Sequence, residues 1–417
     1  MIKSFTRALV VATVFASLTF AFSSKAEAQT FSQRGFVDGR GQFFFEEDPT
    51  DQPRQIGDVM LRQEVFIKPS QWLRLFAGVD LRANSHDQVE DEWRLDFEDR
   101  GILRPKAAVR RLGATISGGR FTLDLGKQFI RWGRADILNP TDRFAPRDYL
   151  TVFDTEFLPV LGARAVVTAG TESFEGVWVP RFTPSRLPLI DQRWTVLPPE
   201  AEGQTIVDGG SIFPKRSQFG ARWNHTGSAF ESSLSFYDGF QNLASFDVRP
   251  VAPDTIEFQR FYPSLRSYGG DLAIPTQIVT LKGEAAYLRS PNHENDDYVL
   301  WVVELERQVG EWVFDGGYAG ENTTNHLGAV RFAPDQGVAK SFIGRVSYTL
   351  GPRRSVAVEG AVRQAGDGEY ARAEYSEAFG QHWRLTFSGV FLGGDESSFI
   401  GQYRHNSNAS AALRFSY

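Results

Sequence analysis

The sequence predicts an all-β protein, a transmembrane antiparallel β-barrel with 18 strands, from its final strand, its strand lengths and its connections. In residues 410–417, Ala411, Leu413, Phe415 and Tyr417 share one face, while small or charged residues share the other. A two-residue period that runs to a final aromatic residue is typical of a strand that closes a barrel. Closure pairs the last strand with the first and leaves no free edge.

The same alternation occurs within the chain, in segments long enough to cross a membrane. In residues 72–83 the odd-numbered positions are apolar, and the even-numbered ones include Arg74, Asp80 and Arg82. Comparable alternation occurs in residues 57–68, 120–131 and 298–307. A soluble β-sandwich has the same period, so length decides between the two folds. These runs have about 10 to 12 residues, whereas globular strands average about 5 or 6 and a barrel span needs about 9–11.

Connections between the predicted strands alternate between short and long. The short ones lie at residues 69–71, 118–119, 169–172, 225–228, 275–276, 308–311, 350–353 and 380–382. The long ones lie near residues 46–56, 84–105, 132–159, 181–215, 239–265, 289–296, 320–339, 365–369 and 393–408. Membrane barrels of bacteria have short periplasmic turns and longer outer loops. This pattern predicts 18 strands with both termini periplasmic, and one missed or invented hairpin would give 16.

Aromatic residues lie beside several predicted turns, where a strand would meet the membrane interface. They are Trp72, Trp312, Trp383, Tyr348 and Phe379. Amphipathic rings favour that zone, because the ring can lie among acyl chains while its polar edge meets headgroups. We expect an interfacial girdle, with ordinary core aromatics as the alternative.

The amino-terminal residues predict a secreted precursor. Lys3 and Arg7 precede an uncharged, mostly apolar run at 8–22, and Ala26 and Ala28 supply the small residues of a cleavage site. We therefore expect a cleaved signal peptide at residues 1–28 and one barrel domain at residues 29–417; an uncleaved anchor is the alternative. The chain has no cysteine, which excludes disulfides and a lipid-anchored amino terminus.

One segment stands apart from the general strand pattern. The run Gly-Lys-Gln-x-x-x-Trp-Gly at 126–133 is followed by Asn-Pro-x-Asp at 139–142, inside the third long loop. These residues resemble a poorly characterised group of porin-like bacterial outer-membrane proteins. Some members of that group are thought to serve export alongside inner-membrane efflux-type transporters. The resemblance covers residues 126–149 and the barrel pattern, and it implies an outer-membrane location with transport through the lumen.

In many porins the third outer loop folds inward and narrows the channel. The charged residues predicted to form such a constriction here are Arg131, Arg134, Asp136, Asp142, Arg143, Arg147 and Asp148. Arginine and aspartate in a narrow, partly dehydrated passage select solutes by charge. The alternative is a structural role, in which these charges pair with one another and Asp142 and Asp148 cap turns.

Two further groups of residues have predicted roles. Polar positions of the alternating strands are expected on the lumen wall, namely Arg62, Glu64, Arg74, Asp80, Arg82, Arg222, Glu304 and Glu306. Leu413, Phe415 and Tyr417 are expected to form the assembly signal, with the barrel-assembly machinery as the partner that reads it.

The function predicted from these observations is a porin-like channel for a small solute, surrounded by outer-membrane lipid. An inner-membrane transporter is a further expected partner if solutes pass outward. One alternative is a plugged barrel whose loops bind a surface ligand or partner. Another is a barrel hydrolase that uses His86, His293 or His326, although the sequence contains no hydrolase or metal motif. We expect no enzyme activity, no cofactor, no metal site and, because the charges are interleaved, no nucleic-acid partner.

Overall fold

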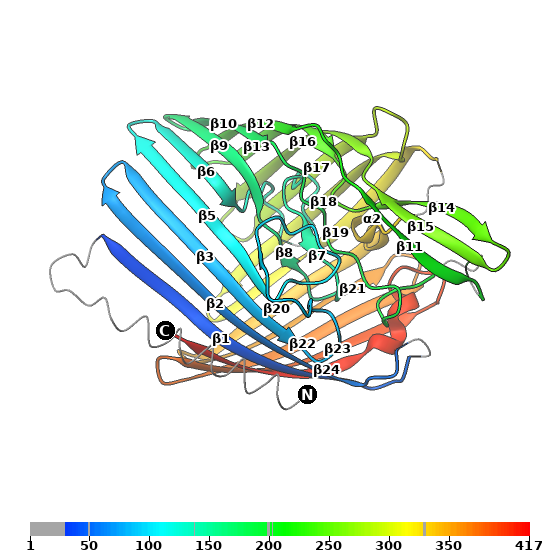
Figure 1. Ribbon diagram of the computed structural model, residues 1–417. Coiled ribbons are helices and arrows are strands. Elements are labelled where there is room, and N and C mark those ends of the chain that lie inside the picture. The colour runs from blue at the N-terminus through cyan, green and yellow to red at the C-terminus, as the bar shows by residue number, and fades with distance from the viewer. Residues whose placement is uncertain (1–29, 49–50, 137, 198–200, 202, 328–330) are drawn as a thin grey trace.

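The computed structural model describes residues 30–48, 51–136, 138–197, 201, 203–327 and 331–417, so the predicted signal peptide lies outside the described residues. Eighteen strands of the described chain form one closed antiparallel barrel (Figure 1), which confirms the predicted fold class and strand number. They are β1 (Phe31–Phe44), β2 (Gln55–Ser70), β3 (Leu73–Asn84), β5 (Ala107–Gly118), β6 (Phe121–Gln128), β9 (Val160–Ala169), β10 (Glu172–Val179), β12 (Gln218–Thr226), β13 (Glu231–Phe240), β16 (Ser264–Pro275), β17 (Thr280–Arg289), β18 (Asp297–Val309), β19 (Trp312–Asn325), β20 (Ser341–Gly351), β21 (Arg354–Arg363), β22 (Gly368–Phe379), β23 (Trp383–Gly394) and β24 (Asn408–Ser416).

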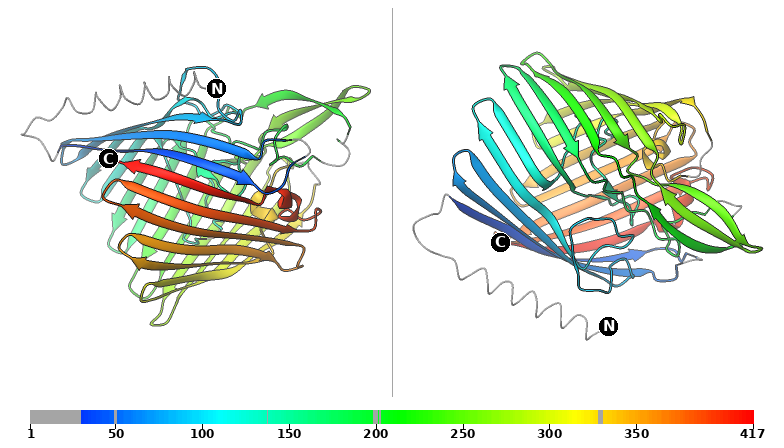
Figure 2. Two further views of the ribbon diagram at one scale, coloured as in Figure 1. Left: turned by 90° about the horizontal axis from the view of Figure 1, so that it is seen from below. Right: turned by 45° about the horizontal axis from the view of Figure 1, so that its top comes forward.

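The barrel closes where β1 pairs with β24, at the seam between the blue and red strands in Figure 2. The final residue takes part in this seam, because Tyr417 and Gly35 exchange two backbone hydrogen bonds of 3.0 Å each. A Cβ atom at Gly35 would lie 2.8 Å from the Tyr417 ring and 2.6 Å from the carbonyl oxygen of Arg62. Glycine is therefore needed at position 35 for the ring of Tyr417 to cover the seam.

The two faces of the barrel differ in chemistry, as the strand alternation predicts. Apolar side chains such as Leu75, Leu305 and Leu413 are exposed on the outer face. On the inner face the guanidinium of Arg62 bonds the carboxylate of Asp80, with Nε and Oδ1 2.7 Å apart. This arrangement lets lipid contact the outside of the cylinder while polar groups line its inside.

Short turns join the strands at one end of the barrel and longer loops join them at the other. We name the loops L1 to L9 in chain order; the ones used below are L2 (85–106), L3 (129–159), L4 (180–217), L5 (241–263), L6 (290–296), L7 (326–340) and L9 (395–407). Aromatic residues gather at the turn end: the Trp312 and Tyr348 rings lie 4.4 Å apart, and the Trp383 and Phe415 rings lie 4.9 Å apart.

The loops contain small elements of their own. L3 holds β7 (Arg147–Asp148) and β8 (Glu156–Phe157), L2 holds β4 (Leu95–Asp96), L7 holds α2 (Pro334–Gly337), and L9 holds the 3₁₀ helix η3 (Gly401–Asn406). A separate three-stranded sheet projects from the loop end (Figure 1) and consists of β11 (Thr205–Ile212), β14 (Ser245–Ala252) and β15 (Thr255–Phe261). No helix within the described ranges is long and apolar enough to span a membrane.

Candidate functional site

L3 contacts opposite walls of the barrel. Near its start, Arg134 forms ion pairs with Asp271 on β16 and Glu231 on β13. Near its end, Glu156 pairs with Arg82 on β3 at 2.5 Å, and Asp154 pairs with Arg40 on β1. In the ring of 18 strands β16 lies nine steps from β1, which is half of the circumference. L3 therefore crosses the bore, and Figures 1 and 2 show β7 and β8 enclosed by the barrel strands.

The carboxylate of Glu284, on β17, holds the first half of L3 against the wall. It accepts hydrogen bonds from the backbone nitrogens of Arg134 (2.9 Å), Ala135 (3.2 Å) and Thr141 (2.8 Å), and from the Thr141 hydroxyl (2.8 Å). Hydrogen bonds to a charged acceptor are roughly twice as strong as neutral ones. A wall carboxylate thus organises the backbone of the loop.

Gly133, the last residue of the Gly-Lys-Gln-x-x-x-Trp-Gly run, is required by this anchor. Its φ is +100°, a region that non-glycine residues rarely adopt. A Cβ atom there would lie 2.8 Å from both carboxylate oxygens of Glu284. Any larger residue would both strain the backbone and separate the loop from its acceptor.

The preceding residues of the run fix the base of L3 to neighbouring segments. The Lys127 ammonium is buried and lies 2.7 Å from the carboxylate of Asp99 and 2.7 Å from the carbonyl oxygen of Phe97, both in L2. The side-chain amide of Gln128 donates to the carbonyl oxygen of Gly162 on β9 at 3.1 Å. Lys127 and Gln128 therefore act as structural anchors.

Trp132 is the side chain that seats L3 on the wall. Its indole Nε1 donates to Glu175 on β10 at 2.7 Å, and its backbone nitrogen donates to Asp142 at 3.1 Å. Gly220 on β12 leaves space for the ring of Trp132, because a Cβ atom there would lie 2.6 Å from the rings of both Trp132 and Phe144. The spacing between Trp132 and Asp142 is thus explained by a hydrogen bond that closes the loop on itself.

The second half of L3 is tied to L2 and L4 by buried charges. Asp148 lies 2.9 Å from Arg104 of L2 and 3.3 Å from Arg186 of L4, and Arg186 also pairs with Asp99 at 2.9 Å. Burial would raise the pKa of Asp148, but the guanidinium groups of Arg104 and Arg186 outweigh it and lower that pKa. Burial would likewise raise the pKa of Asp99, but the positive charges of Arg186 and Lys127 outweigh burial and lower that pKa.

Two predicted constriction arginines flank one aromatic ring in L3. The guanidinium carbons of Arg131 and Arg147 lie 3.8 Å and 4.3 Å from the ring centroid of Phe157. Arg131 also pairs with Asp142 at 3.2 Å, whereas Arg147 makes no ion pair with any other residue that the structure describes. Arg147 therefore carries a cationic charge that no described carboxylate neutralises at short range.

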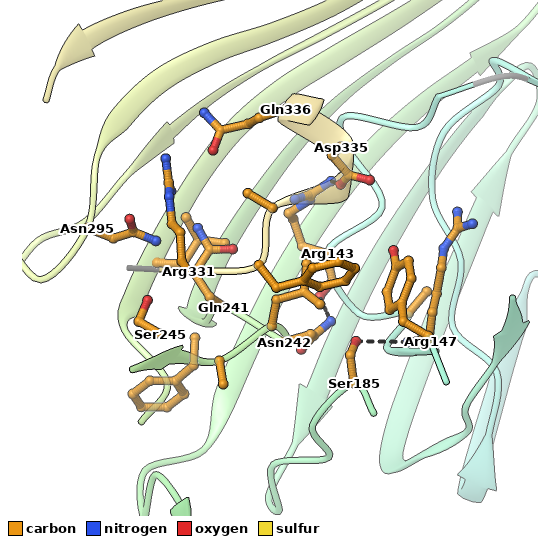
Figure 3. A pocket seen from close by; sticks show the side chains of 18 of the residues that line it. Arg143, Arg147, Ser185, Gln241, Asn242, Ser245, Asn295, Arg331, Asp335 and Gln336 are labelled. Carbon is orange, nitrogen blue, oxygen red and sulfur yellow. Dashed lines mark hydrogen bonds and ion pairs between the residues drawn. The ribbon is translucent and has the colours of Figure 1, made fainter. Parts of the chain in front are cut away.

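Polar cavities lie beside L3. One of about 70 Å³ is lined by Arg143 and Arg147 of L3, Asn295 of L6, and Arg331 and Asp335 of L7 (Figure 3). Another, of about 120 Å³, lies beside β1, β2, β3 and β24 and is lined by residues that include Arg40, Arg82, Asp154 and Arg414. The loop thus leaves hydrophilic space between itself and the wall.

The structure divides the predicted constriction residues into two groups. Arg134, Asp136, Asp142 and Asp148 are engaged in anchoring contacts: the Asp136 carboxylate pairs with Lys282, and its backbone nitrogen donates to Glu304 at 2.9 Å. Arg143 and Arg147 line the 70 Å³ cavity, and the side chain of Arg131 is 46% exposed.

The predicted lumen-wall residues lie on the inward face of their strands, and most make ion pairs there. Their contacts are Arg62 to Asp80 (2.7 Å), Glu64 to Arg34 (2.6 Å), Arg82 to Glu156 (2.5 Å), Arg222 to Asp271 (2.7 Å), Glu306 to Lys282 (2.6 Å) and Arg74 to the ring of Phe66 (4.6 Å). Glu304 is fully buried beneath L3, where it accepts the backbone N–H of Asp136.

Sequence reasoning missed the wall carboxylates that receive L3, above all Glu175, Asp271 and Glu284. Each occupies an inward position of an alternating strand, and that was the available signal, but their partners depend on how L3 folds. Carboxylate oxygens of Asp136, Glu304 and Asp315 also lie within 4.8 Å of one another, a set that could offer ligands to a cation. Lys282, which pairs with Asp136, already supplies a positive charge there.

Comparison with known proteins identifies the architecture. No protein-family model and no curated protein sequence matches the chain. Among solved structures it is similar to Acinetobacter baumannii OccAB4 (TM-score 0.58, 10% identity, covering 94% of this chain and 99% of that one). It is also similar to a BenF-like porin from Pseudomonas fluorescens Pf-5 (0.55, 10%, 93% and 98%) and to Pseudomonas aeruginosa OpdQ (0.52, 11%, 93% and 98%). The chain therefore has the fold of the bacterial outer-membrane porins.

Proposed function

We propose that the protein is a porin-like channel for small solutes in the bacterial outer membrane, and that L3 narrows its bore. The observation that carries this proposal is the path of L3, which bridges opposite walls through Arg134 and Asp154 while polar cavities of about 70 and 120 Å³ remain beside it. A closed barrel of this size encloses an aqueous lumen unless something fills it.

Arg143 and Arg147 are the residues of L3 that we assign to selection by charge. Both line the 70 Å³ cavity, and Arg147 has no carboxylate partner among the described residues. The nearest acid to Arg143 is Asp335, at 3.7 Å. Fixed cations in a narrow passage attract anions and repel cations, so the channel is expected to prefer anions.

The test is single-channel recording in planar lipid bilayers with a salt gradient across the membrane. We expect discrete conductance steps, and we expect Arg143→Ala and Arg147→Ala to shift the reversal potential toward cation preference. Arg266→Ala is the matched control, because Arg266 pairs with Asp238 on the outer face and its loss leaves the bore unchanged. Identical reversal potentials in the wild type and in all three variants would contradict the assignment.

A plugged barrel is the second candidate, and one packing feature favours it. Val152 of L3, Trp194 of L4 and Tyr403 of L9 lie in a single apolar cluster with Ala361 and Leu392 of the inner wall. Such a cluster blocks part of the bore. The bilayer experiment separates the two functions, since a plugged barrel would show no conductance steps. The rings of His86 and His326 bond the carboxylates of Asp51 and Asp296, and among the described residues no serine hydroxyl bonds either ring, so neither pair has a nucleophile positioned for a hydrolase.

The proposal extends to direction and partners. The resemblance of residues 126–149 supports an export role with an inner-membrane transporter, and Tyr417 in the seam supports its role in assembly. Cross-linking from the turn end in intact cells tests the first idea, because an exporter should recover a transporter complex there. Deletion of Tyr417 tests the second, with heat-modifiable migration in gels as the measure of folded barrel.

A further inference from the structure

A third and larger cavity lies at the loop end of the barrel. Its volume is about 640 Å³, and its lining comes from L4, L7, L9 and the projecting sheet of β14 and β15. Cavities of roughly 300–1,000 Å³ are the usual size of small-molecule sites in proteins. We call this cavity the vestibule.

Aromatic side chains from separate segments meet at the vestibule. The projecting sheet contributes Phe246 and Phe258, whose ring centroids lie 5.8 Å apart. Trp194 of L4 and Tyr403 of L9 lie 5.7 Å apart, and Phe399 of L9 lies 5.6 Å from Tyr403. Trp194 and Tyr403 are buried and support the vestibule wall, whereas Phe246 and Phe399 are partly exposed and leave surface on which another ring can stack or pack edge-on.

Each arginine of the vestibule is paired with a carboxylate, and Glu321, the lining carboxylate without a cation among the described residues, accepts hydrogen bonds from Gln336 and Thr323. The lining of the vestibule includes three arginines, Arg260, Arg331 and Arg363, and three carboxylates, Asp296, Glu321 and Asp367. Arg331 pairs with Asp296 at 2.7 Å, and Arg363 pairs with Asp367 at 2.8 Å. Arg260 pairs at 2.6 Å with Asp208 of β11, which lies outside the lining. A site whose cations are already paired gains little from a charged ligand, so the lining favours an uncharged one.

The vestibule adjoins the arginine-lined cavity beside L3. Arg331, Phe332, Ala333 and Gln336 of L7 line both cavities. A molecule held in the vestibule therefore lies one layer of side chains from Arg143 and Arg147.

We infer that the vestibule, on the outer side of L3, binds an uncharged small molecule that carries an aromatic ring and a polar group. The ring would pack against Phe246 and Phe399, beside the buried Trp194 and Tyr403, and the polar group would bond side chains such as Gln336 or Gln402. This inference rests on the proposed channel function, to which it adds a class of solute.

The test is saturation-transfer NMR on the protein in lipid nanodiscs, with benzamide as the probe. Acetamide keeps the amide without the ring, and benzoate keeps the ring with a charge. The variant is Val196→Asp, because Val196 lines the vestibule and is 47% exposed, so a charge there leaves the fold intact. The matched control is Val207→Asp on β11, which is 41% exposed and outside the vestibule lining.

We expect saturable benzamide binding in the wild type and in Val207→Asp, and an affinity at least fivefold weaker in Val196→Asp. Acetamide and benzoate are expected to bind at least fivefold more weakly than benzamide. Equal binding of benzamide by Val196→Asp and the wild type, or equal binding of acetamide and benzamide, would overturn the inference. Conductance of the same proteins is recorded in parallel. Normal conductance with no benzamide binding rejects the vestibule alone, whereas an absence of conductance with normal binding rejects the channel and keeps the site.

Discussion

The carboxylate of Glu284 lies 2.8 Å from the backbone nitrogen of Thr141 and 2.8 Å from its hydroxyl oxygen, and it joins a membrane-spanning strand to the loop inside the barrel. A Cβ atom on Gly269 would lie only 2.6 Å from the methyl group of Thr141, so the missing side chain at Gly269 makes room for that methyl group. The wall thus supplies both an acceptor and a recess for the same loop residue. L3 is held by specific contacts and is expected to be rigid while Glu284 is intact.

Removal of that acceptor should release the loop. In Glu284→Ala, the backbone N–H groups of Arg134, Ala135 and Thr141 and the hydroxyl of Thr141 lose their charged acceptor. Each such hydrogen bond contributes about 1.5–3 kcal/mol. We expect a larger and noisier single-channel conductance and faster cleavage of L3 by trypsin. Glu306→Ala is the control, since Glu306 pairs with Lys282 and makes none of the Thr141 contacts. Identical behaviour of both variants would show that Glu284 does not hold the loop.

Filling the recess under Trp132 should have a similar effect by a different route. Gly220→Val would place atoms within 2.6 Å of the Trp132 and Phe144 rings and must displace L3. Overpacking of this kind costs about 1–3 kcal/mol. Gly176→Val is the control, because a Cβ atom there meets nothing within 4 Å. The measurement is the urea midpoint of unfolding, which should fall only for Gly220→Val, together with a changed conductance.

The buried charges between the loops predict a stability effect. Lys127→Met removes one of the two cations that pair with Asp99 and keeps a side chain of similar length. Breaking a buried ion pair costs about 3–5 kcal/mol when the remaining charge has no partner, and the cost here is smaller because Asp99 keeps Arg186 at 2.9 Å. We expect a lower thermal midpoint and easier proteolysis of L2. Lys68→Met, at an exposed strand end, should match the wild type; a thermal midpoint unchanged by Lys127→Met would argue against the network.

Asp142 predicts a pH response of L3. Burial raises its pKa from 3.8 to about 6, although the Trp132 N–H and Arg131 act in the opposite direction. Because the docked loop binds this proton more tightly than the unfolded chain does, docking is most stable below pH 3.8 and weakens as pH rises through about 6. Tryptophan fluorescence and conductance should therefore show a transition near pH 6.

Asp142→Asn should abolish that transition, because it removes the titrating group. Glu156→Gln should keep it: burial raises the pKa of Glu156, but Arg82 and Arg62 outweigh this and lower it to about 2, far from the transition. A transition near pH 6 that persists in Asp142→Asn would assign it to another group.

The strands were predictable because their side chains alternate between lipid and lumen, and this constraint acts locally. Leu75, Leu305 and Leu413 face outward in the structure, as their positions in the sequence indicate. The position of Tyr417 in the seam follows from the same period. The eight short turns also lie where the sequence predicted them, since each turn interrupts an otherwise regular alternation.

The role of L3 residues was harder to predict, because it depends on contacts between distant segments. Lys127 and Trp132 belong to a conspicuous run, yet their partners Asp99 and Glu175 lie in other elements. Nothing near Glu284 indicates that four loop donors will reach it. The projecting sheet was missed for a local reason: β14 contains Pro250, and its short strands lie in segments that otherwise read as loops.

The path of L3 has a mechanical consequence. A hollow cylinder under lateral pressure flattens easily, because bending its wall changes few contacts. A strut fixed at Arg134 on one side and at Asp154 on the other spans the diameter, so flattening along that axis must compress or break the strut. The loop therefore helps the barrel keep its cross-section under the lateral pressure of the membrane.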